Sequence, residues 1–394
     1  MRTEIITSLA QVDAAAWDAL TGDNNPFIEH AFLSLMETSG SVGAEAGWEP
    51  HHVLVWEGDQ LVGAAPAYLK DNSYGEYIFD WSWADAAHRL GIPYFPKLVI
   101  AAPFTPATGP RLLVHPNANK EDVWHTLLNR LKTLVGELGA WSFHILFCTD
   151  EEADFIEREG YIRRATYQFH WRNNQYTSFD DFLGALRSRN RKQIRKERKK
   201  ACGAGLEIEL LYGDEATDED WEMMYKLYMS TAARKWGQPY LTHDFFRQAR
   251  TSLGARPLLL FARRDGEVRA GTLSFAKGKH VYGRYWGCFE YCDGLHFELC
   301  YYRLIEYAIE RGGLLVEAGA QGQHKIKRGY LPVVTHSGHH FEVEELGHAL
   351  NHIMQREASF MRKDIEEAQK DGPFREDSIP PFPARAGICL DTHT

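Results

Sequence analysis

The pattern of apolar and polar positions along the chain predicts helices and strands that alternate in two successive units. Apolar residues at helical spacing predict helices over residues 13–20, 29–38, 121–138, 299–311 and 342–370. A basic run over residues 187–200 is also predicted to be a helix. Runs of β-branched and aromatic residues predict strands over residues 51–56, 61–69, 74–81, 141–147, 281–286 and 314–318. Residues 82–110 are predicted to form a long aromatic and proline-bearing loop, and loops of that length are usually functional.

The second unit repeats the first in the same order. The segment PFIEHAF at residues 26–32 matches PYLTHDF at residues 239–245, and YGEY at residues 74–77 matches YGRY at residues 282–285. Several matches in one order, at nearly constant spacing, indicate a duplication rather than a solenoid of many short repeats. We therefore expect an N-terminal domain over residues 1–178, a C-terminal domain over residues 179–345 that begins with a basic helix at 187–200, and a C-terminal helix and tail over residues 346–394.

Polar residues gather near the ends of the predicted elements within residues 280–340. In open α/β sheets, ligands bind in the crevice beyond the carboxyl ends of strands, so this stretch is a candidate active site. The candidate catalytic residues are Glu317, His296, Glu298 and His324. The candidate substrate-binding residues of the same stretch are Arg284, Gln321, Lys325 and Arg328.

Each of these candidates also has a structural interpretation. Glu317 follows a predicted buried strand, where burial would raise its pKa towards that of a general base, but it could instead pair with Arg284 or Lys325. His296 and His324 can accept a proton near neutral pH, although a single histidine is more often a hydrogen-bonded structural residue. Glu298 could be an acidic residue that stabilises the start of a helix.

The first unit contains an acidic and aromatic cluster at the expected end of a strand, formed by Asp80, Trp81, Trp83 and Asp85. A tryptophan face with flanking carboxylates can bind a sugar ring or an amine, so Asp80, Trp81 and Asp85 are candidate substrate-binding residues. The alternative is edge packing of large aromatic rings with capping aspartates. Further donors could come from the long loop, namely Lys97, Thr105, Thr108 and Arg111.

Nine cations lie within residues 187–200 of an otherwise acidic chain. At helical spacing Arg187, Arg191, Arg195 and Arg198 would share one face and could contact several phosphates together. The candidate phosphate-binding residues are Arg187, Arg191, Lys192 and Arg195. The alternative is a solvated interdomain helix without a ligand.

Composition and charge narrow the class of protein. Hydrophobic residues at 44% and charged residues at 25% are typical of a soluble globular protein. The formal net charge of −10 argues against a protein that coats nucleic acid nonspecifically, although a local basic patch could still bind phosphate. No apolar run approaches the roughly 20 residues of a membrane span, and the N-terminus lacks a signal-peptide core, which predicts a cytoplasmic protein.

The six cysteines show neither paired CxxC spacing nor a disulfide framework, so we expect reduced thiols. A triplet of His296, Glu298 and Cys300 lacks a fourth ligand, and no metal is expected. Covalent catalysis through Cys288, Cys292 or Cys300 is a minor alternative, because direct attack by an amine needs no enzyme nucleophile.

Several segments resemble a known family when they are taken together. They are PFIEHAFLSLMETSGSVG, SYGEYIFDWSWADA, YFPKLVIAAPFTPATGPRLL, LHFELCYYRLIEYAI and EAGAQGQHKIKRGYLP, and they extend from residue 26 to residue 336. The chain resembles the FemAB-like family labelled peptidoglycan biosynthesis or recognition, within the GNAT (acyl-CoA N-acyltransferase) superfamily. The resemblance implies an α/β (α+β) fold with two tandem GNAT-like domains and mixed, largely antiparallel sheets.

The same resemblance implies acyl or aminoacyl transfer to an amine acceptor such as a peptidoglycan precursor. The coenzyme A loop of acetyltransferases, Arg/Gln-x-x-Gly-x-Gly/Ala, is matched neither by FEYCDGLHFELC nor by AAPFTPATGPRLLV. FemAB-type enzymes, which also lack that loop, use aminoacyl-tRNA, so the expected donor is either aminoacyl-tRNA or acyl-CoA. The rival hypothesis is a non-catalytic GNAT-like protein that binds a peptidoglycan precursor or a nucleotide-sugar, because fold alone does not settle function.

Overall fold

The computed structural model describes residues 1–203, 205–234, 239–319, 322–370, 372–378 and 380. The candidate Gln321 lies outside these residues. The elements of the first half are β1 (Arg2–Ile6), η1 (Leu9–Gln11), α1 (Ala14–Asp18), η2 (Pro26–Ile28), α2 (His30–Thr38), β2 (Glu49–Pro50), β3 (His52–Glu57), β4 (Gln60–Ala65), β5 (Ala67–Lys70), α3 (Trp81–Arg89), β6 (Lys97–Ile100), β7 (Leu113–Val114), α4 (Lys120–Glu137), β8 (Ser142–Cys148), α5 (Asp150–Arg158) and β9 (Ile162–Arg172).

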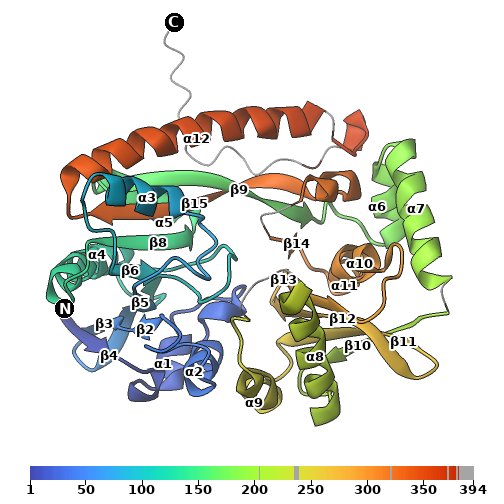
Figure 1. Ribbon diagram of the computed structural model, residues 1–394, viewed down its shortest axis with the longest axis horizontal. Coiled ribbons are helices and arrows are strands. Elements are labelled where there is room, and N and C mark those ends of the chain that lie inside the picture. The colour runs from blue at the N-terminus through green and yellow to red at the C-terminus, as the bar shows by residue number, and fades with distance from the viewer. Residues whose placement is uncertain (204, 235–238, 320–321, 371, 379, 381–394) are drawn as a thin grey trace, which may run out of the picture.

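The second half continues from α6 to the C-terminal helix, which crosses the top of the view in Figure 1. Its elements are α6 (Phe179–Ala185), α7 (Ser188–Cys202), β10 (Glu207–Tyr212), α8 (Asp218–Arg234), α9 (His243–Leu253), β11 (Pro257–Arg264), β12 (Glu267–Lys277), β13 (His280–Cys288), α10 (Leu295–Phe297), η3 (Glu298–Tyr302), α11 (Arg303–Glu310), β14 (Leu315–Glu317), η4 (Gln323–Arg328), β15 (Leu331–Phe341), α12 (Glu344–Lys370) and η5 (Glu376–Ser378). The helix predicted over residues 299–311 therefore begins with the π-helical turn η3.

The two halves share one large sheet. An eleven-stranded sheet runs in the order β10-β11-β12-β13-β14-β9-β15-β8-β6-β5-β2, and a four-stranded sheet runs in the order β1-β3-β4-β7. In the large sheet β9 of the first half pairs with β14, and β15 of the second half pairs with β8. The halves thus exchange their last strands. The boundary between the two copies at residues 178 and 179 remains a prediction from the sequence.

Two parallel strand pairs occupy corresponding places in the two halves. Residues 98–100 of β6 lie opposite residues 143–145 of β8, and residues 280–282 of β13 lie opposite residues 315–317 of β14. The repeated segments also meet in space, because Phe32 of α2 and Phe245 of α9 have ring centroids 6.4 Å apart. These contacts agree with a duplicated unit whose copies pack against each other.

Both faces of the second-half sheet are packed against helices, and alternate side chains of β11 enter two different cores. Leu259 and Phe261 enter a core with α8, α9 and the first-half helices, whereas Leu258 and Leu260 enter a second core with α7 and α11. Successive strand residues point to opposite faces, so β11 is apolar on both. The C-terminal helix α12 packs along β9 and β15 (Figure 1).

The strand predicted over residues 74–81 is wrong. These residues form an irregular segment with positive φ at Tyr77 (63°) and Phe79 (55°), and α3 begins at Trp81. Glu76 and Asp80 both reach the buried ammonium of Lys97, at 2.8 and 2.5 Å. Four residues of strand span about 13 Å, so an extended chain would keep these carboxylates apart. The long loop predicted over residues 82–110 is likewise interrupted by α3 and β6.

Candidate functional site

The parallel pair β13 and β14 ends at a break in the sheet. Beyond residues 282 and 317 the register between the two strands stops. On its other edge β13 contains a bulge, because Leu273 lies opposite Tyr285 and Ser274 opposite Gly283, which skips Arg284. A bulge bends its strand and takes one residue out of the ladder, so β13 turns here away from regular pairing.

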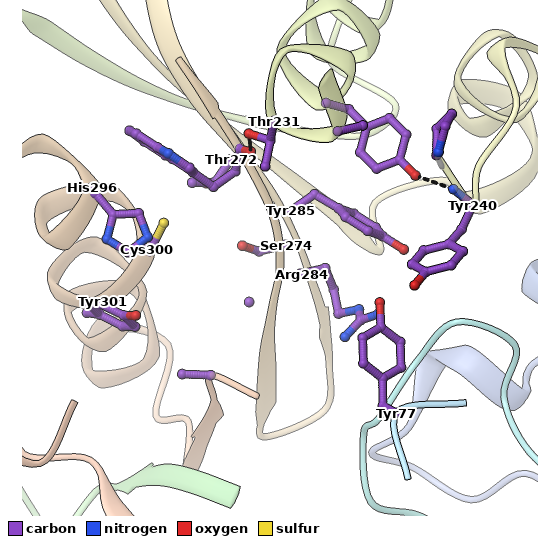
Figure 2. Close-up of a pocket in the computed structure, with 16 residues that line it drawn as sticks. Tyr77, Thr231, Tyr240, Thr272, Ser274, Arg284, Tyr285, His296, Cys300 and Tyr301 are labelled. Atoms are coloured by element: carbon purple, nitrogen blue, oxygen red, sulfur yellow. Dashed lines mark hydrogen bonds between the residues drawn. The ribbon is translucent and has the colours of Figure 1, made fainter. Parts of the chain in front are cut away.

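A cavity of about 480 Å³, which we call the central pocket, lies at this break (Figure 2). The strands contribute Thr272 and Ser274 of β12 and Gly283 of β13, and Ala318 follows directly after β14. One side is lined by Tyr77, Tyr228, Thr231, Tyr240, Arg284 and Tyr285. The other side is lined by Trp286, His296, Cys300 and Tyr301. Figure 2 shows His296, Cys300 and Tyr301 across β12 and β13 from Tyr77, Tyr240 and Arg284, so the central pocket contacts both faces of the sheet.

Unused hydrogen-bonding groups line the central pocket. Thr272 and Ser274 alternate on β12, and among the described residues their buried hydroxyl oxygens have no hydrogen-bond partner. Burial raises the pKa of Tyr77, Tyr228 and Tyr301, so these phenols keep their protons and remain donors. Because a buried polar group without a partner costs free energy, such a lining favours a polar ligand.

His296 and Cys300 lie one helical turn apart, and both line the central pocket. The imidazole of His296 packs edge to face on Trp286 and Tyr301, with ring centroids 5.2 and 5.6 Å away. The π-helical turn η3 places Cys300 and Tyr301 on the same wall, and π-turns are frequent at functional sites. Of the predicted catalytic residues, His296 is the one that lines the central pocket.

Arg284, the residue of the bulge, lines the central pocket and contacts the first half. Its guanidinium donates a hydrogen bond to the carbonyl of Phe104 and lies 5.3 Å from the ring centroid of Tyr285. The ring of Phe104 in turn stacks on Tyr240, with centroids 4.9 Å apart. Residues of the first half therefore complete a wall of the central pocket.

Glu317 is buried at the end of β14, just behind the central pocket. The next residue, Ala318, lines the pocket, and the Glu317 carboxyl accepts a hydrogen bond of 3.4 Å from the backbone N–H of Thr108. Burial raises the pKa of Glu317 to about 8. Burial also lowers the pKa of His170, whose Nε2 lies 3.7 Å from Glu317 Oε2, to about 3. At neutral pH the two groups form a neutral pair, and not an ion pair.

Other candidates of the second half take part in ion pairs. Glu298 is fully buried between Arg198 and Arg303, at 3.0 and 2.9 Å, and does not line the central pocket. Arg328 is paired with Glu197 at 2.7 Å and lies 3.4 Å from the centroid of the Phe297 ring. These two residues join α7, the π-turn and η4 into one structural unit.

His324 and Lys325 lie next to the central pocket without lining it. The Nε2 of His324 is 3.1 Å from the hydroxyl of Tyr301, which does line the pocket. Lys325 donates to the carbonyl of Gly319 at 3.0 Å, which fixes the chain after β14. Burial lowers the pKa of Lys325 to about 8. The pKa of His324 is also below its usual value, because of burial and of the nearby positive charges of Arg328 and Lys325.

The first-half candidates do not form a common site. Asp80 is fully buried against Lys97 and Tyr94, whose hydroxyl is 2.6 Å away. Burial alone would raise the pKa of Asp80, but Lys97 and these hydrogen bonds hold it below the usual value. Asp85 is exposed and paired with Arg89, and Trp81 is exposed beside Tyr74. The three side chains share the N-terminal part of α3 but point into different surroundings.

The basic helix α7 packs against α10 and η3, beside the His296 side of the central pocket. Some of its cations are used within the protein: Arg198 pairs with Glu298, Arg195 with Asp180 at 3.3 Å, and Arg187 donates to the carbonyl of Phe374. The cations without an ion-pair partner among the described residues are Arg189, Arg191, Lys192, Lys196 and Lys199. Arg198 turns inward, so the single face of arginines predicted from helical spacing is wrong.

The residues that the sequence did not indicate are Thr272, Ser274 and the tyrosines of the central pocket. A usable signal existed for the first two, because they are polar at alternate positions within the otherwise uncharged and apolar segment 270–276 of β12. In the part of the chain that the structure describes, no group of three or more His, Cys, Asp or Glu residues could hold a metal ion. None of the described helices has the length and apolarity needed to cross a bilayer.

Comparison with known proteins places this architecture in a family. The family model described as FemAB-like, peptidoglycan biosynthesis/recognition, matches residues 8–376. The chain belongs to the FemAB-like family. No curated protein sequence matches this FemAB-like chain.

Solved structures share the fold of the FemAB-like chain at low sequence identity. FemX aligns with a TM-score of 0.54 at 11% identity, over 89% of this chain and 100% of FemX. The C-terminal domain of a putative lysylphosphatidylglycerol synthetase from Agrobacterium fabrum gives 0.54 at 9% identity, over 87% and 96%. A conserved protein of unknown function from Bacteroides thetaiotaomicron gives 0.52 at 11% identity, over 86% and 99%. The predicted α/β fold with largely antiparallel sheets is confirmed.

Proposed function

We propose that this protein transfers an acyl or aminoacyl group from an activated donor to an amine, and that the central pocket is the site of transfer. One observation carries the proposal: the pocket lies where β13 and β14 part and is lined from both faces of the sheet. A two-substrate reaction needs both reactants in one place, and an opening through a sheet lets each arrive from its own side. Holding them in that geometry supplies much of the rate enhancement.

The chemistry needs a group that stabilises the oxyanion as the amine attacks the carbonyl. The bulge at Arg284 takes backbone groups out of the ladder beside the pocket, and the protonated phenols of Tyr77 and Tyr301 add side-chain donors. Donors fixed before the reaction stabilise developing charge without reorganisation. We assign this role to the bulge and its neighbouring phenols, with Arg284 as a nearby positive charge.

The attacking amine must also lose a proton. We assign this role to Glu317 or to His296, because Glu317 adjoins the pocket wall with a pKa of about 8 and His296 lines the pocket directly. A general base is most effective when its pKa is near the working pH. Cys300 lies beside His296, so an acyl-thiol intermediate is the alternative that Cys300→Ala tests.

The donor would approach from the α7 side. Exposed cations of α7 lie on the helix that packs against α10, and they suit a donor that carries phosphate groups. Aminoacyl-tRNA and acyl-CoA both have this property. Family membership favours a peptidoglycan precursor as acceptor and a cytoplasmic location, where both donors are made.

The test is mass spectrometry of an acceptor mixture after incubation with the full chain. One arm supplies acetyl-CoA, one supplies a pool of aminoacyl-tRNAs, and both contain peptidoglycan precursors. The proposal expects an acceptor mass increased by one acyl or aminoacyl group in one arm, and no increase without protein. Binding of a precursor without a product in either arm would favour the non-catalytic alternative and contradict acyl transfer.

A further inference from the structure

A second cavity lies between the central sheet and the C-terminal helix α12. It has a volume of about 360 Å³ and is bounded by residues 164–168 of β9, His336 and Ser337 of β15, and the helix residues Glu357 to Asp364. Residues 77–79 close one side of it. We call it the α12 cavity.

The inner wall of the α12 cavity has an unused hydrogen-bond acceptor. Gln168 is 1% exposed, and its amide nitrogen donates to the carbonyl of Pro106 at 2.6 Å. Its Oε1 is buried without a hydrogen-bond partner among the described residues. The amide nitrogen already has a partner, and the amide oxygen can only accept a hydrogen bond. The wall therefore suits a ligand with an N–H or O–H group.

The mouth of the α12 cavity has an unpaired negative charge. Glu357 is neutralised by Arg164 at 2.9 Å. Asp364 is exposed at the rim, and among the described residues it has neither an ion pair nor a hydrogen bond. Burial raises the pKa of Tyr167 on the cavity wall, and the charge of Asp364 adds to this shift. The rim therefore attracts a cation.

Apolar side chains lie between these two polar ends. Ile78, Phe79, Phe147, Phe360 and Met361 line the α12 cavity, and Phe79 and Phe360 are 51% and 59% exposed. Large exposed aromatic side chains that adjoin one cavity are typical of a ligand site. A ligand that matches this wall has a short hydrocarbon chain between its polar ends.

The wall between the two cavities has an unusual backbone. Tyr77 lines both the α12 cavity and the central pocket. Tyr77, Phe79 and Phe147 have φ values of 63°, 55° and 52°, in a region that bulky residues rarely adopt. Such conformations persist where surrounding contacts impose them, and they concentrate at ligand sites. The partition formed by these aromatic residues is therefore a specific feature of the fold.

We propose that the α12 cavity binds an aliphatic diamine, with its outer ammonium at Asp364 and its inner amine donating to the Oε1 of Gln168. The proposal rests on the proposed function in one respect, that the inner amine is the acyl acceptor. Gln168 and His170 alternate on β9 and share a face, which brings the inner amine towards the Glu317 and His170 pair. Burial favours the uncharged form of an amine, and that form is the nucleophile.

Calorimetric titration of the full chain with 1,3-diaminopropane through 1,6-diaminohexane tests the site, with pentylamine and 1,5-pentanediol as comparisons. We expect at least one diamine to bind about tenfold more tightly than pentylamine, and the diol to bind more weakly than either. Asp364→Asn should weaken diamine binding by roughly fivefold to tenfold, whereas Glu366→Gln, an exposed acid on the same helix, should leave it unchanged.

The inner contact is tested by Gln168→Met, which should remove the preference for diamine over monoamine. Because this residue is buried, its unfolding curve is compared with that of the wild type, and Phe360→Ala provides an exposed second variant that should weaken all the amines about threefold. Equal affinities for the diamine, the monoamine and the diol would overturn the proposal. Diamine binding that is unchanged in Asp364→Asn would overturn it as well.

Failure of this site can be distinguished from failure of the proposed transfer reaction. Thr272→Val, in the central pocket, should reduce acylation of a bound diamine about tenfold while leaving its affinity unchanged. Acylation of a diamine at the same KM in Asp364→Asn and wild type would overturn the site and leave acyl transfer standing. Saturable diamine binding that depends on Asp364, with no acylated product, would support the site and contradict its role as the acceptor site.

Discussion

The two parallel strand pairs of this protein run in opposite directions within the large sheet, and one gap is filled whereas the other is a pocket. Between β6 and β8 of the first half, residues 101–112 fold back into the gap. Arg111 is fully buried there and donates to the carbonyls of Leu146, Gly109 and Ala107, at 2.8, 3.0 and 2.6 Å. The backbone N–H of Gly109 also bonds the carbonyl of Phe147 at 3.1 Å, so this segment replaces the missing ladder.

Between β13 and β14 of the second half, the chain leaves β13 at Cys288 and enters α10 at Leu295. The gap remains as the central pocket, and the filling segment of the first half contacts Arg284 through the carbonyl of Phe104 and Glu317 through the N–H of Thr108. A duplicated frame can thus serve two purposes, because the connection that follows the first parallel strand decides whether the gap is core or site. The filled gap of the first half contributes to the stability of the fold, and the open gap of the second half forms the candidate site.

The largest expected effect comes from emptying the filled gap. Arg111→Met leaves several buried carbonyls without donors, so the free energy of unfolding should fall by about 3–5 kcal/mol. Arg284→Met, the matched change at the open gap, should cost about 0.5–1.5 kcal/mol, since it removes one hydrogen bond to Phe104. Urea unfolding measures both. An equal loss of unfolding free energy in the two variants would contradict the claim that only the first-half gap is filled by core residues.

Glu317→Gln tests the chemistry of the open gap. We expect the rate of acyl transfer by the wild type to rise with pH until about pH 8, as Glu317 ionises, and then to level off. The variant should lose that rise and about a hundredfold or more in kcat, as expected for a general base. A rate that rises through pH 8 in the variant would assign the proton transfer to another group, His296 first.

The same carboxyl makes a separate prediction about stability. Its pKa is raised in the folded protein, so the stabilisation belongs to the neutral form and is complete below the unfolded value of about 4.3. It is lost as pH rises towards the folded value of about 8. Unfolding free energies measured from pH 4 to 8 should therefore decline more steeply in the wild type than in Glu317→Gln. Parallel curves would contradict the raised pKa.

A smaller effect is expected for the unpaired hydroxyls of the central pocket. Thr272→Val and Ser274→Ala each remove a buried oxygen that has no partner among the described residues, so stability should stay equal or increase by about 1 kcal/mol. Acyl transfer should fall about tenfold, because a bound substrate loses a hydrogen bond. A loss of stability together with unchanged transfer would place these hydroxyls in the core and not in a site.

The smallest effect concerns the approach of the donor. Arg191→Glu with Lys192→Glu should raise the KM for a phosphate-bearing donor by roughly fivefold at low salt and reduce its salt dependence. Lys132→Glu, an exposed change on α4 that lies outside both cavities, is the matched control and should leave the donor KM unchanged. The acceptor KM should not change in either variant. Identical donor KM values in the α7 variant and in the control would contradict a role of α7 in donor binding.

The sequence predicted the frame of the molecule better than its site. Periodicity placed the elements now seen as α4, β8, β13, β14 and α12, since each buries its own apolar face. Candidates such as Glu298 and Arg328 had local contexts typical of a site, yet their partners Arg198 and Glu197 lie on α7, far away in the chain. Ion pairs between distant segments leave no local pattern, so paired and unpaired charges look alike in the sequence.

The first-half cluster illustrates the same limit. Asp80 and Trp81 are adjacent in the chain, but the buried ammonium of Lys97 draws Asp80 inward while Trp81 remains exposed. The position of the central pocket depends on the gap between β13 and β14 and on the segment that fills the other gap. Both are consequences of tertiary packing, which a single sequence does not encode as a motif.

If acyl transfer occurs in the gap between β13 and β14, a bulky side chain in that gap should stop it. Ala232 lines the central pocket from α8, so Ala232→Trp should occupy the space that a substrate needs. With the donor that supports turnover in the wild type, we expect product measured by mass spectrometry to fall at least a hundredfold, with an unchanged urea midpoint. Transfer at the wild-type rate in this folded variant would contradict the claim.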